Sequence, residues 1–244
     1  MEDKPLVEVE DLGLIAYAKA WEYQQQLHKL LIDHKRSYRD ISSKERPKQR
    51  HKFLFCEHHP VLTLGKSGKE SHLLTSEEGL RAEGVEFFRI NRGGDITFHG
   101  PGQLVGYPIF DLDEFFTDVH QYVRYIEQAI MSTLTDYGLH SLRIPGYTGV
   151  WLPGEGDRPA RKICAIGVHL SRWVTMHGFA LNVNTQLQYF QHIIPCGISE
   201  VNMEVTSLAK EIGREVSLNE VKSLVLRHFA STFGFHHVAK KPCL

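Results

Sequence analysis

Short β-rich segments, several of them separated by a turn, dominate the middle of this 244-residue sequence. Residues 52–58 and 61–65 flank the turn-like pair His59-Pro60, and residues 95–110 divide into two candidate strands at Gly100-Pro101-Gly102. Further strand-like runs occupy residues 84–90, 139–144, 149–153, 162–171 and 175–184. Such hairpin-like pairs predict an α+β fold with a single, mixed, mostly antiparallel sheet and flanking helices, rather than a doubly wound parallel sheet.

Three segments show helical periodicity. The first contains Leu14, Tyr17, Ala18, Trp21, His28 and Leu31 at spacings of three and four. The second runs from Val119 to Tyr137, with Gly138 as a C-cap. The third begins at the capping-box pattern Ser217-x-x-Glu220 and should end at Gly234. No linker divides the chain, so the sequence predicts a single domain over residues 1–244.

The charge balance argues against general binding to nucleic acid or acidic membranes. The chain has 28 Lys+Arg and 29 Asp+Glu, a formal net charge of −1. No apolar run is long enough to cross a membrane, and the acidic start lacks the features of a secretory signal, so we expect a cytoplasmic protein. Basic residues concentrate between positions 35 and 50, in a stretch that we read as a solvated loop or, alternatively, as a docking surface for acidic partners; they are Lys35, Arg36, Arg39, Lys44, Arg46, Lys48 and Arg50.

Cysteine and histidine spacings give no metal motif. Cys56, Cys164, Cys196 and Cys243 form no C-x-x-C pair and are expected to be reduced thiols. The 15 histidines include no His-Glu-x-x-His pattern, so we predict no dedicated metal site.

The segment from Arg92 to Gln103 is rich in glycine and proline. Glycines let a backbone approach a ligand closely, and Arg92 and His99 could present polar groups to one pocket. The alternative is an ordinary hairpin with a tight turn. The segment matches neither a P-loop nor G-x-G-x-x-G, so a nucleotide phosphate site is not indicated.

Lys162 and Cys196 are the residues with the clearest catalytic potential. Lys162 heads an apolar strand-like run; a desolvated lysine can act as acid or base near neutral pH, whereas a lysine at a strand edge would simply face water. Cys196 lies between Pro195 and Gly197, on a constrained turn. It is either a buried thiol in an apolar loop or a nucleophile, and a nearby cation such as Lys162 would activate it.

Together these segments resemble the octanoyltransferase (lipoyl(octanoyl) transferase) family. The resemblance rests on RGGDITFHGPGQLVGYPI at 92–109, KICAIGVHL at 162–170, HGFALNVN at 177–184 and PCGI at 195–198, and it covers about Phe53 to Leu208. It implies the catalytic-domain fold of lipoate and biotin protein ligases. It also implies transfer of an octanoyl group from octanoyl-acyl carrier protein to a lysine of lipoyl domains, in protein lipoylation.

The resemblance also implies residue roles. Cys196 matches the nucleophile that carries the acyl group as a thioester, and Lys162 matches the lysine that lowers the pKa of that thiol. The substrate-binding positions implied are Arg92, Gly93, Gly94, Asp95, Ile96, Thr97, Phe98, His99, Ala165, Ile166, Gly167, Gly178, Phe179 and Ala180. Leu104, Ile166 and Phe179 are expected to line an apolar tunnel. No metal, ATP or other cofactor is expected, because a thioester is already activated.

The expected acceptors are lipoyl domains of 2-oxoacid dehydrogenase complexes and the glycine cleavage H protein. An ATP-dependent lipoate or biotin ligase is the first alternative, but it needs an adenylate-binding glycine loop, where this sequence has TFHGPGQ and Cys196. A lipoyl-domain amidotransferase using a similar cysteine is the second alternative, and its sequence signals are nearly the same. A non-enzymatic lipoyl-domain-binding module would need neither Lys162 nor Cys196.

Overall fold

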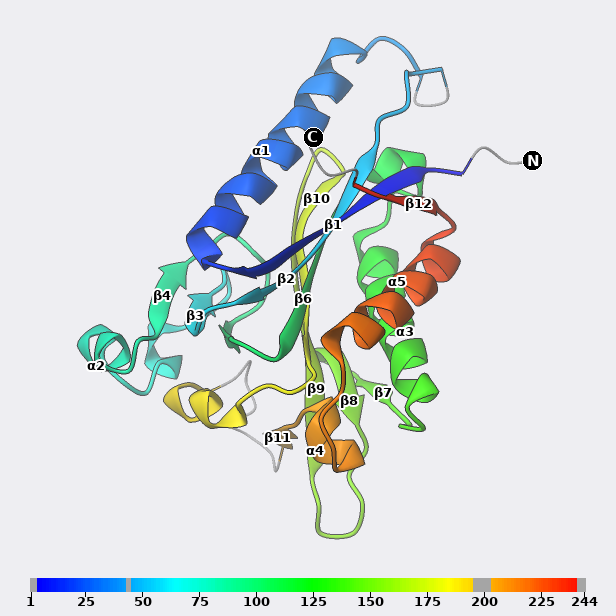
Figure 1. Cartoon of the computed structure of the whole chain (residues 1–244). Coiled ribbons are helices and arrows are strands. Elements are labelled where there is room, and N and C mark those ends of the chain that lie inside the picture. The colour runs from blue at the N-terminus through cyan, green and yellow to red at the C-terminus, as the bar shows by residue number, and fades with distance from the viewer. Residues whose placement is uncertain (1–3, 43–44, 195–202, 241–244) are drawn as a thin grey trace.

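The computed structural model describes residues 4–42, 45–194 and 203–240, and its largest element is a nine-stranded sheet (Figure 1). The path through this sheet is β12-β1-β2-β6-β10-β9-β8-β7, and β11 pairs with β9. The strands are β1 (Leu6–Ile15), β2 (His51–His58), β6 (Gln103–Ile109), β7 (Leu142–Ile144), β8 (Tyr147–Leu152), β9 (Ala160–Ser171), β10 (Val174–Asn182), β11 (Met203–Val205) and β12 (His236–Ala239). All pairings from β2 to β7 are antiparallel, whereas β1–β2, β1–β12 and β9–β11 are parallel.

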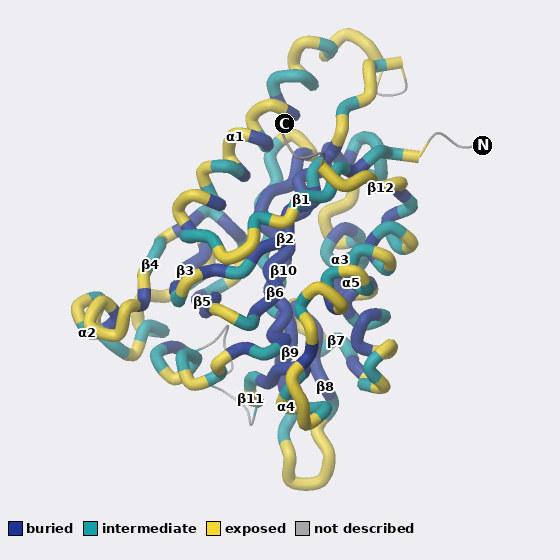
Figure 2. The backbone as a smooth tube through the Cα atoms, in the orientation of Figure 1, coloured by how far each residue is buried: buried dark blue, intermediate teal, exposed yellow. Residues whose placement is uncertain are grey.

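Helices cover both faces of this sheet (Figure 1). Helix α1 (Tyr17–Ser37) packs on one face, over β6 and β10. Helices α3 (Val119–Asp136) and α5 (Leu218–Phe233) pack on the opposite face, and a short helix, α4 (Leu208–Ile212), precedes α5. The strands between these layers are the most buried part of the chain (Figure 2).

A smaller sheet stands beside the large one. Its order is β4-β3-β5, formed by β3 (Val61–Leu64), β4 (Glu86–Arg89) and β5 (Ile96–His99). Helix α2 (Glu77–Ala82) and the 3-10 turns Glu70–His72 and Leu187–His192 pack around it; another 3-10 turn, Leu112–Glu114, follows β6. The predicted mixed, mostly antiparallel α+β fold with flanking helices is confirmed.

Helix ends follow the sequence signals closely. Helix α3 ends at Asp136, and Gly138 adopts the positive φ (74°) of a helix-ending glycine. Helix α5 begins after Ser217, whose hydroxyl accepts a hydrogen bond from the backbone N–H of Glu220, and it ends at Gly234.

Strand β1 and its neighbour β12, which forms the edge of the sheet, were not predicted. Leu14 belongs to β1 rather than to the first helix, which starts at Tyr17. The run LVEVEDLGLI alternates as a strand does, but its charged residues hide the pattern. Strand β12 is exposed along its length and pairs in parallel with β1, so it forms through main-chain pairing that no local hydrophobic pattern signals.

The two strands within residues 95–110 do not form a hairpin in one sheet. Strand β5 belongs to the small sheet and β6 to the large one, so Gly100-Pro101-Gly102 carries the chain from one sheet to the other. Gly102 has a φ of +78°, and a Cβ there would lie 2.6 Å from the carbonyl oxygen of Asn184. Only glycine fits this crossing without displacing the neighbouring backbone.

Candidate active site

A cavity lies where the small sheet faces β6, β10 and β9 of the large one. Its empty volume is about 450 Å³, open mouth included. Ten of the predicted substrate-binding residues line it: Arg92, Gly94, Thr97, His99, Ala165, Ile166, Gly167, Gly178, Phe179 and Ala180. Segments separated by more than 60 residues in the sequence thus meet around one hollow, whose exposed lining is mostly apolar.

Strand alternation explains why other predicted residues lie elsewhere. On β5, Thr97 and His99 face the cavity, while Ile96 and Phe98 pack into the core of the small sheet. Leu104 on β6 packs against the α3 and α5 side, so its predicted place in the tunnel lining is wrong.

Gly93 and Asp95 are also absent from the cavity lining. The backbone N–H of Gly93 donates to the carbonyl oxygen of Val168 at 2.8 Å, which joins this loop to β9. Asp95 accepts hydrogen bonds from His72 and from the backbone N–H groups of Lys69 and Ile96. Both residues therefore hold the loop that carries Arg92.

Arg92 is a buried cation at the edge of the cavity. Its guanidinium donates to the carbonyl oxygen of Thr63 at 2.6 Å, to the Thr63 hydroxyl at 2.9 Å and to the carbonyl oxygen of Gly93 at 3.1 Å. A Cβ at Gly65 would lie 2.8 Å from Nη1 of Arg92, and one at Gly167 would lie 3.0 Å from its Cδ. The two glycines make room for the arginine side chain.

Among the described residues, four more line the cavity: Tyr17, Val105, Tyr107 and His177. Sequence reasoning treated Tyr17 as part of the apolar face of a helix, and only the tertiary fold brings it to the site. Tyr107 and His177 lie within the motifs that carry the family resemblance, so those motifs were the signal that could have identified them.

His177 has an unusual backbone conformation for a residue within a strand. Its φ is 62°, in the left-handed region that few non-glycine residues adopt. Its backbone N–H donates to Oε1 of Gln24 on α1 at 3.0 Å, and its Nε2 lies 2.9 Å from Oδ1 of Asn91. His177 thereby connects α1, β10 and the residue that precedes Arg92.

The histidines of this region are neutral near pH 7. Burial lowers the pKa of His58 to about 4 and the pKa values of His99 and His177 to about 3. The Nδ1–H of His99 donates to Oε1 of Gln103 at 2.8 Å. The amide nitrogen of Gln103 donates to Phe98 and Asn182, which fixes the orientation of its oxygen toward His99.

These depressed pKa values predict a loss of stability in acid. Between the ordinary histidine pKa of 6.5 and the folded values, the unfolded chain binds more protons than the folded chain, so the free energy of unfolding should decrease as the pH falls from 6.5 to 4. Denaturant titrations across this range would measure the decrease. A His58→Gln variant should show a shallower pH dependence than the unsubstituted protein; an equal slope would contradict this account.

Lys162 is buried next to the cavity. It lines a second hollow together with Thr97, Gln103, Ala165, Ala180, Asn182, Phe190 and Val205, and three of these residues also line the main cavity. Its Nζ lies 4.7 Å from the centroid of the Trp151 ring. With only 6% of the residue exposed, the alternative of a lysine facing water at a strand edge is wrong.

The strand around Lys162 is firmly held. The backbone N–H of Thr206 donates to the carbonyl oxygen of Lys162 at 2.9 Å, and the adjacent Arg161 forms hydrogen bonds of 3.0 and 3.2 Å with the carboxylate of Glu211. Burial tends to raise the pKa of Glu211, but hydrogen bonds from Thr206 and Arg161 outweigh it, so the net pKa lies below the ordinary value. The carboxylate stays ionised opposite Arg161.

Cys196 and Cys243 lie outside the described residues, so the predicted Lys162–Cys196 pair stays a prediction. The other two cysteines, Cys56 and Cys164, are buried, and burial raises the pKa of each thiol well above its ordinary value. Neither is suited to act as a thiolate nucleophile.

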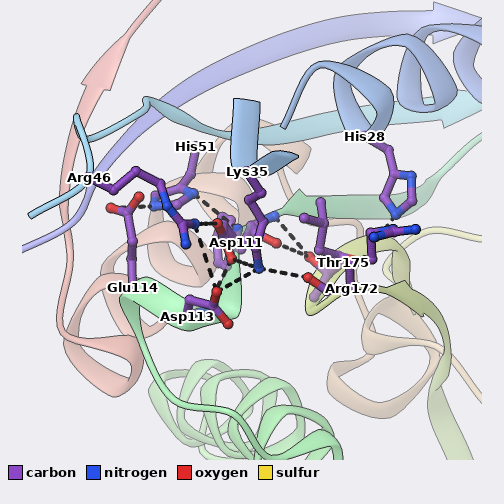
Figure 3. A network of polar contacts seen from close by, with 11 residues as sticks. His28, Lys35, Arg46, His51, Asp111, Asp113, Glu114, Arg172 and Thr175 are labelled. Atoms are coloured by element: carbon purple, nitrogen blue, oxygen red, sulfur yellow. Dashed lines mark hydrogen bonds and ion pairs between the residues drawn. The ribbon is translucent and has the colours of Figure 1, made fainter. Parts of the chain in front are cut away.

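The basic stretch does not match a simple solvated loop. Nζ of Lys35 lies 2.6 Å from Asp111 and 2.9 Å from Asp113, and Nη1 of Arg46 lies 3.4 and 3.8 Å from the same carboxylates (Figure 3). About nine-tenths of each cationic side chain is buried. These two residues anchor the stretch to the turn after β6.

The basic stretch also lies far from Lys162. Nζ of Lys35 donates to the carbonyl oxygen of Arg172, in the turn between β9 and β10. Lys162 is ten residues earlier, near the opposite end of β9, and at the rise of a β-strand this is about 33 Å. Lys35 and Arg46 are therefore not part of the cavity.

The large mixed sheet, the small sheet beside it and the cavity between them define a class of catalytic domain. Residues 16–230 match the lipoyl protein ligase A/B catalytic domain family, and the chain belongs to that family. Within it, the chain is 54% identical over 228 residues to an octanoyltransferase of Cytophaga hutchinsonii, with 93% of each chain covered. It is 55% identical over 228 residues to an octanoyltransferase of Christiangramia forsetii, covering 93% of this chain and 95% of that one. The predicted octanoyltransferase relationship is confirmed.

Solved structures share the fold at low sequence identity. A lipoate-protein ligase A bound with ATP matches with a TM-score of 0.65 and 14% identity, over 98% of this chain and 90% of that one. A bipartite lipoate protein ligase from Thermoplasma acidophilum matches with a TM-score of 0.65 and 16% identity, over 99% of this chain and 89% of that one. None of the helices in the described ranges has the length and apolarity that a membrane span requires.

Proposed function

We propose that this chain transfers an octanoyl group from octanoyl-acyl carrier protein to a specific lysine of a lipoyl domain, through a thioester on Cys196. The observation that carries the proposal is the mostly apolar cavity that continues to a buried lysine. An octanoyl chain has six methylenes, and burying each is worth about 0.8 kcal/mol, so such a cavity supplies about 5 kcal/mol of binding free energy. The names of the relatives support the same acyl group.

In the first half-reaction, the Cys196 thiol loses its proton and the thiolate attacks the thioester carbonyl of the donor. The carbon–sulfur bond to the carrier breaks, and the released carrier thiolate takes up a proton. We assign both proton movements to Lys162, whose side chain lies in the hollow beside the cavity: its neutral amine accepts the thiol proton, and the ammonium then gives that proton to the carrier thiolate. Backbone N–H groups of the glycine-rich turns are candidates to stabilise the developing oxyanion.

In the second half-reaction, the lysine of the lipoyl domain gives up a proton to Lys162 and attacks the acyl-enzyme. As the new amide bond forms, the bond to the Cys196 sulfur breaks, and the departing thiolate takes up the second proton of the attacking nitrogen. Since both substrates use one site in turn, we expect ping-pong kinetics. The acceptors that we propose are the lipoyl domains of 2-oxoacid dehydrogenase complexes and the glycine cleavage H protein, and the cytoplasm is the proposed location.

Intact mass spectrometry tests this function directly. The protein is mixed with octanoyl-acyl carrier protein alone, and then with an unmodified lipoyl domain. We expect one octanoyl group on the protein in the first mixture and one on the lipoyl domain in the second, without ATP. Transfer that occurs only from free octanoate with ATP would instead identify a ligase, and transfer only from an octanoylated lipoyl domain would identify an amidotransferase.

A further inference from the structure

A bulge in β9 turns Lys162 toward the cavity side of the sheet. Val150 on β8 is paired with Cys164, and the next residue, Trp151, is paired with Lys162, so β9 has one extra residue here. That residue, Ile163, packs with Cys164 into the core beside α3 and α5, whereas Lys162 lines the hollow next to the cavity. In a regular strand Lys162 and Cys164 would share a face. The bulge therefore redirects the lysine side chain.

The ring of Trp151 is the surface against which the head group of Lys162 lies. Nζ of Lys162 is 4.7 Å from the centroid of this ring, and Trp151 is fully buried. The indole Nε1–H donates to the carbonyl oxygen of Tyr147 at 3.2 Å, and the Tyr147 ring packs edge-on at a centroid distance of 6.1 Å. These contacts fix the plane of the indole, so its face stays presented to the lysine nitrogen.

A ring face suits a lysine that must both accept and release a proton. Among the residues that the structure describes, no carboxylate forms an ion pair with Nζ of Lys162. A neighbouring carboxylate would hold the ammonium in a buried ion pair, which is costly to break. A cation–π contact contributes less, so the ring stabilises the ammonium and still allows the proton to leave.

We propose that Trp151 is a positioning residue for Lys162: the face of its ring holds the ammonium of this side chain in the hollow beside the cavity. The proposal rests on the acyl transfer proposed above, because it assigns a support to the lysine that moves protons in that reaction. Trp151 itself lines neither hollow, so it acts through Lys162 rather than through the acyl chain.

NMR spectroscopy on protein labelled with ¹³C at the lysine ε-carbons tests the contact itself. Protons above the face of an aromatic ring resonate upfield, so we expect the Hε signal of Lys162 upfield of the signals of exposed lysines such as Lys29. Lys162→Arg assigns this signal by removing it. In Trp151→Leu the signal should move to the position of the exposed lysines. A Lys162 signal that lies among them in the unsubstituted protein would overturn the proposal.

Kinetics with octanoyl-acyl carrier protein test the role of the contact. Loss of the ring face should lower kcat about 30-fold in Trp151→Leu, the equivalent of about 2 kcal/mol for a desolvated cation–π contact. KM should stay close to its original value, because the fully buried Trp151 cannot meet the carrier protein. Trp151→Phe keeps an aromatic face and should retain most of kcat.

Trp173→Leu is the matched control, because Trp173 lies in the exposed turn between β9 and β10 and lines neither hollow. Its kcat should not change. Trp151→Met, with a flexible side chain that can fill the space of the ring, takes the place of Trp151→Leu if that variant does not fold.

Three kinetic results would overturn the proposal: an unchanged kcat in the folded Trp151→Leu or Trp151→Met, an equal loss of kcat in Trp151→Phe, or a loss that is confined to KM. Absence of octanoyl transfer by the unsubstituted protein, with the upfield Lys162 signal present, would instead refute the proposed function and leave the contact established.

Discussion

Replacement of Lys162 by alanine is expected to lower acyl transfer by a factor of about 10² to 10⁴, the usual range for loss of a general acid–base group. The side chain is buried beside the cavity, and among the residues that the structure describes no other lysine lines either hollow. The fold should survive, because the strand is held by main-chain bonds to β8, β10 and β11 that the substitution leaves in place. Lys29→Ala, at an exposed lysine of α1, is the control and should retain full activity.

The reactivity of the Cys196 thiol separates the two roles assigned to Lys162. A neighbouring cation should depress the apparent pKa of this thiol below its ordinary value of about 8.5. The rate of iodoacetamide alkylation at Cys196, followed against pH, measures this effect. Its midpoint should rise in Lys162→Ala.

Lys162→Arg keeps the positive charge but cannot release a proton near pH 7. It should therefore keep a low alkylation midpoint and still fail at turnover. If the alkylation profile of Lys162→Ala matches that of the unsubstituted protein, Lys162 is not the activating partner of the thiol.

The parts of the fold that could be predicted are those with strong local signals. The amphipathic stripe of α3, the cap at Ser217 and the turn residues between strands each act within a few positions, so the sequence displays them. Strand β12 and the crossing from β5 to β6 depend on pairing between distant segments. No local pattern specifies such partners.

The candidate site likewise contains residues that the sequence predicted and residues that only the tertiary fold brings there. The family resemblance located the glycine-rich loop, the strand of Lys162 and its partner strand. The resemblance did not distinguish the two faces of β5. Side chains alternate along a strand, so Thr97 and His99 face the cavity, whereas Ile96 and Phe98 face away from it. The contribution of Tyr17 depends on where α1 packs, and the ion pairs of Lys35 and Arg46 depend on carboxylates more than 60 residues away. Neither could be read from neighbouring residues.

Substitution of Cys196 should have the largest effect of any single change. Removing the nucleophile of a covalent mechanism costs several orders of magnitude in kcat, and we expect a loss on the order of 10⁴-fold or more in Cys196→Ala and Cys196→Ser. After incubation with octanoyl-acyl carrier protein, both variants should show no added octanoyl group by intact mass spectrometry.

The other cysteines provide the controls. Cys56 and Cys164 are buried thiols whose pKa values burial raises, so neither should form a thioester. Cys164→Ala and Cys243→Ala should both keep the adduct, and peptide mapping should place it at Cys196.

Cys164 is the informative comparison, because it is two residues from Lys162 in the same strand, and closeness along the chain alone would favour it. Its thiol lies in the core shared with α3 and α5, whereas Lys162 opens onto the cavity. An octanoyl group mapped to Cys164 would therefore refute the proposed nucleophile.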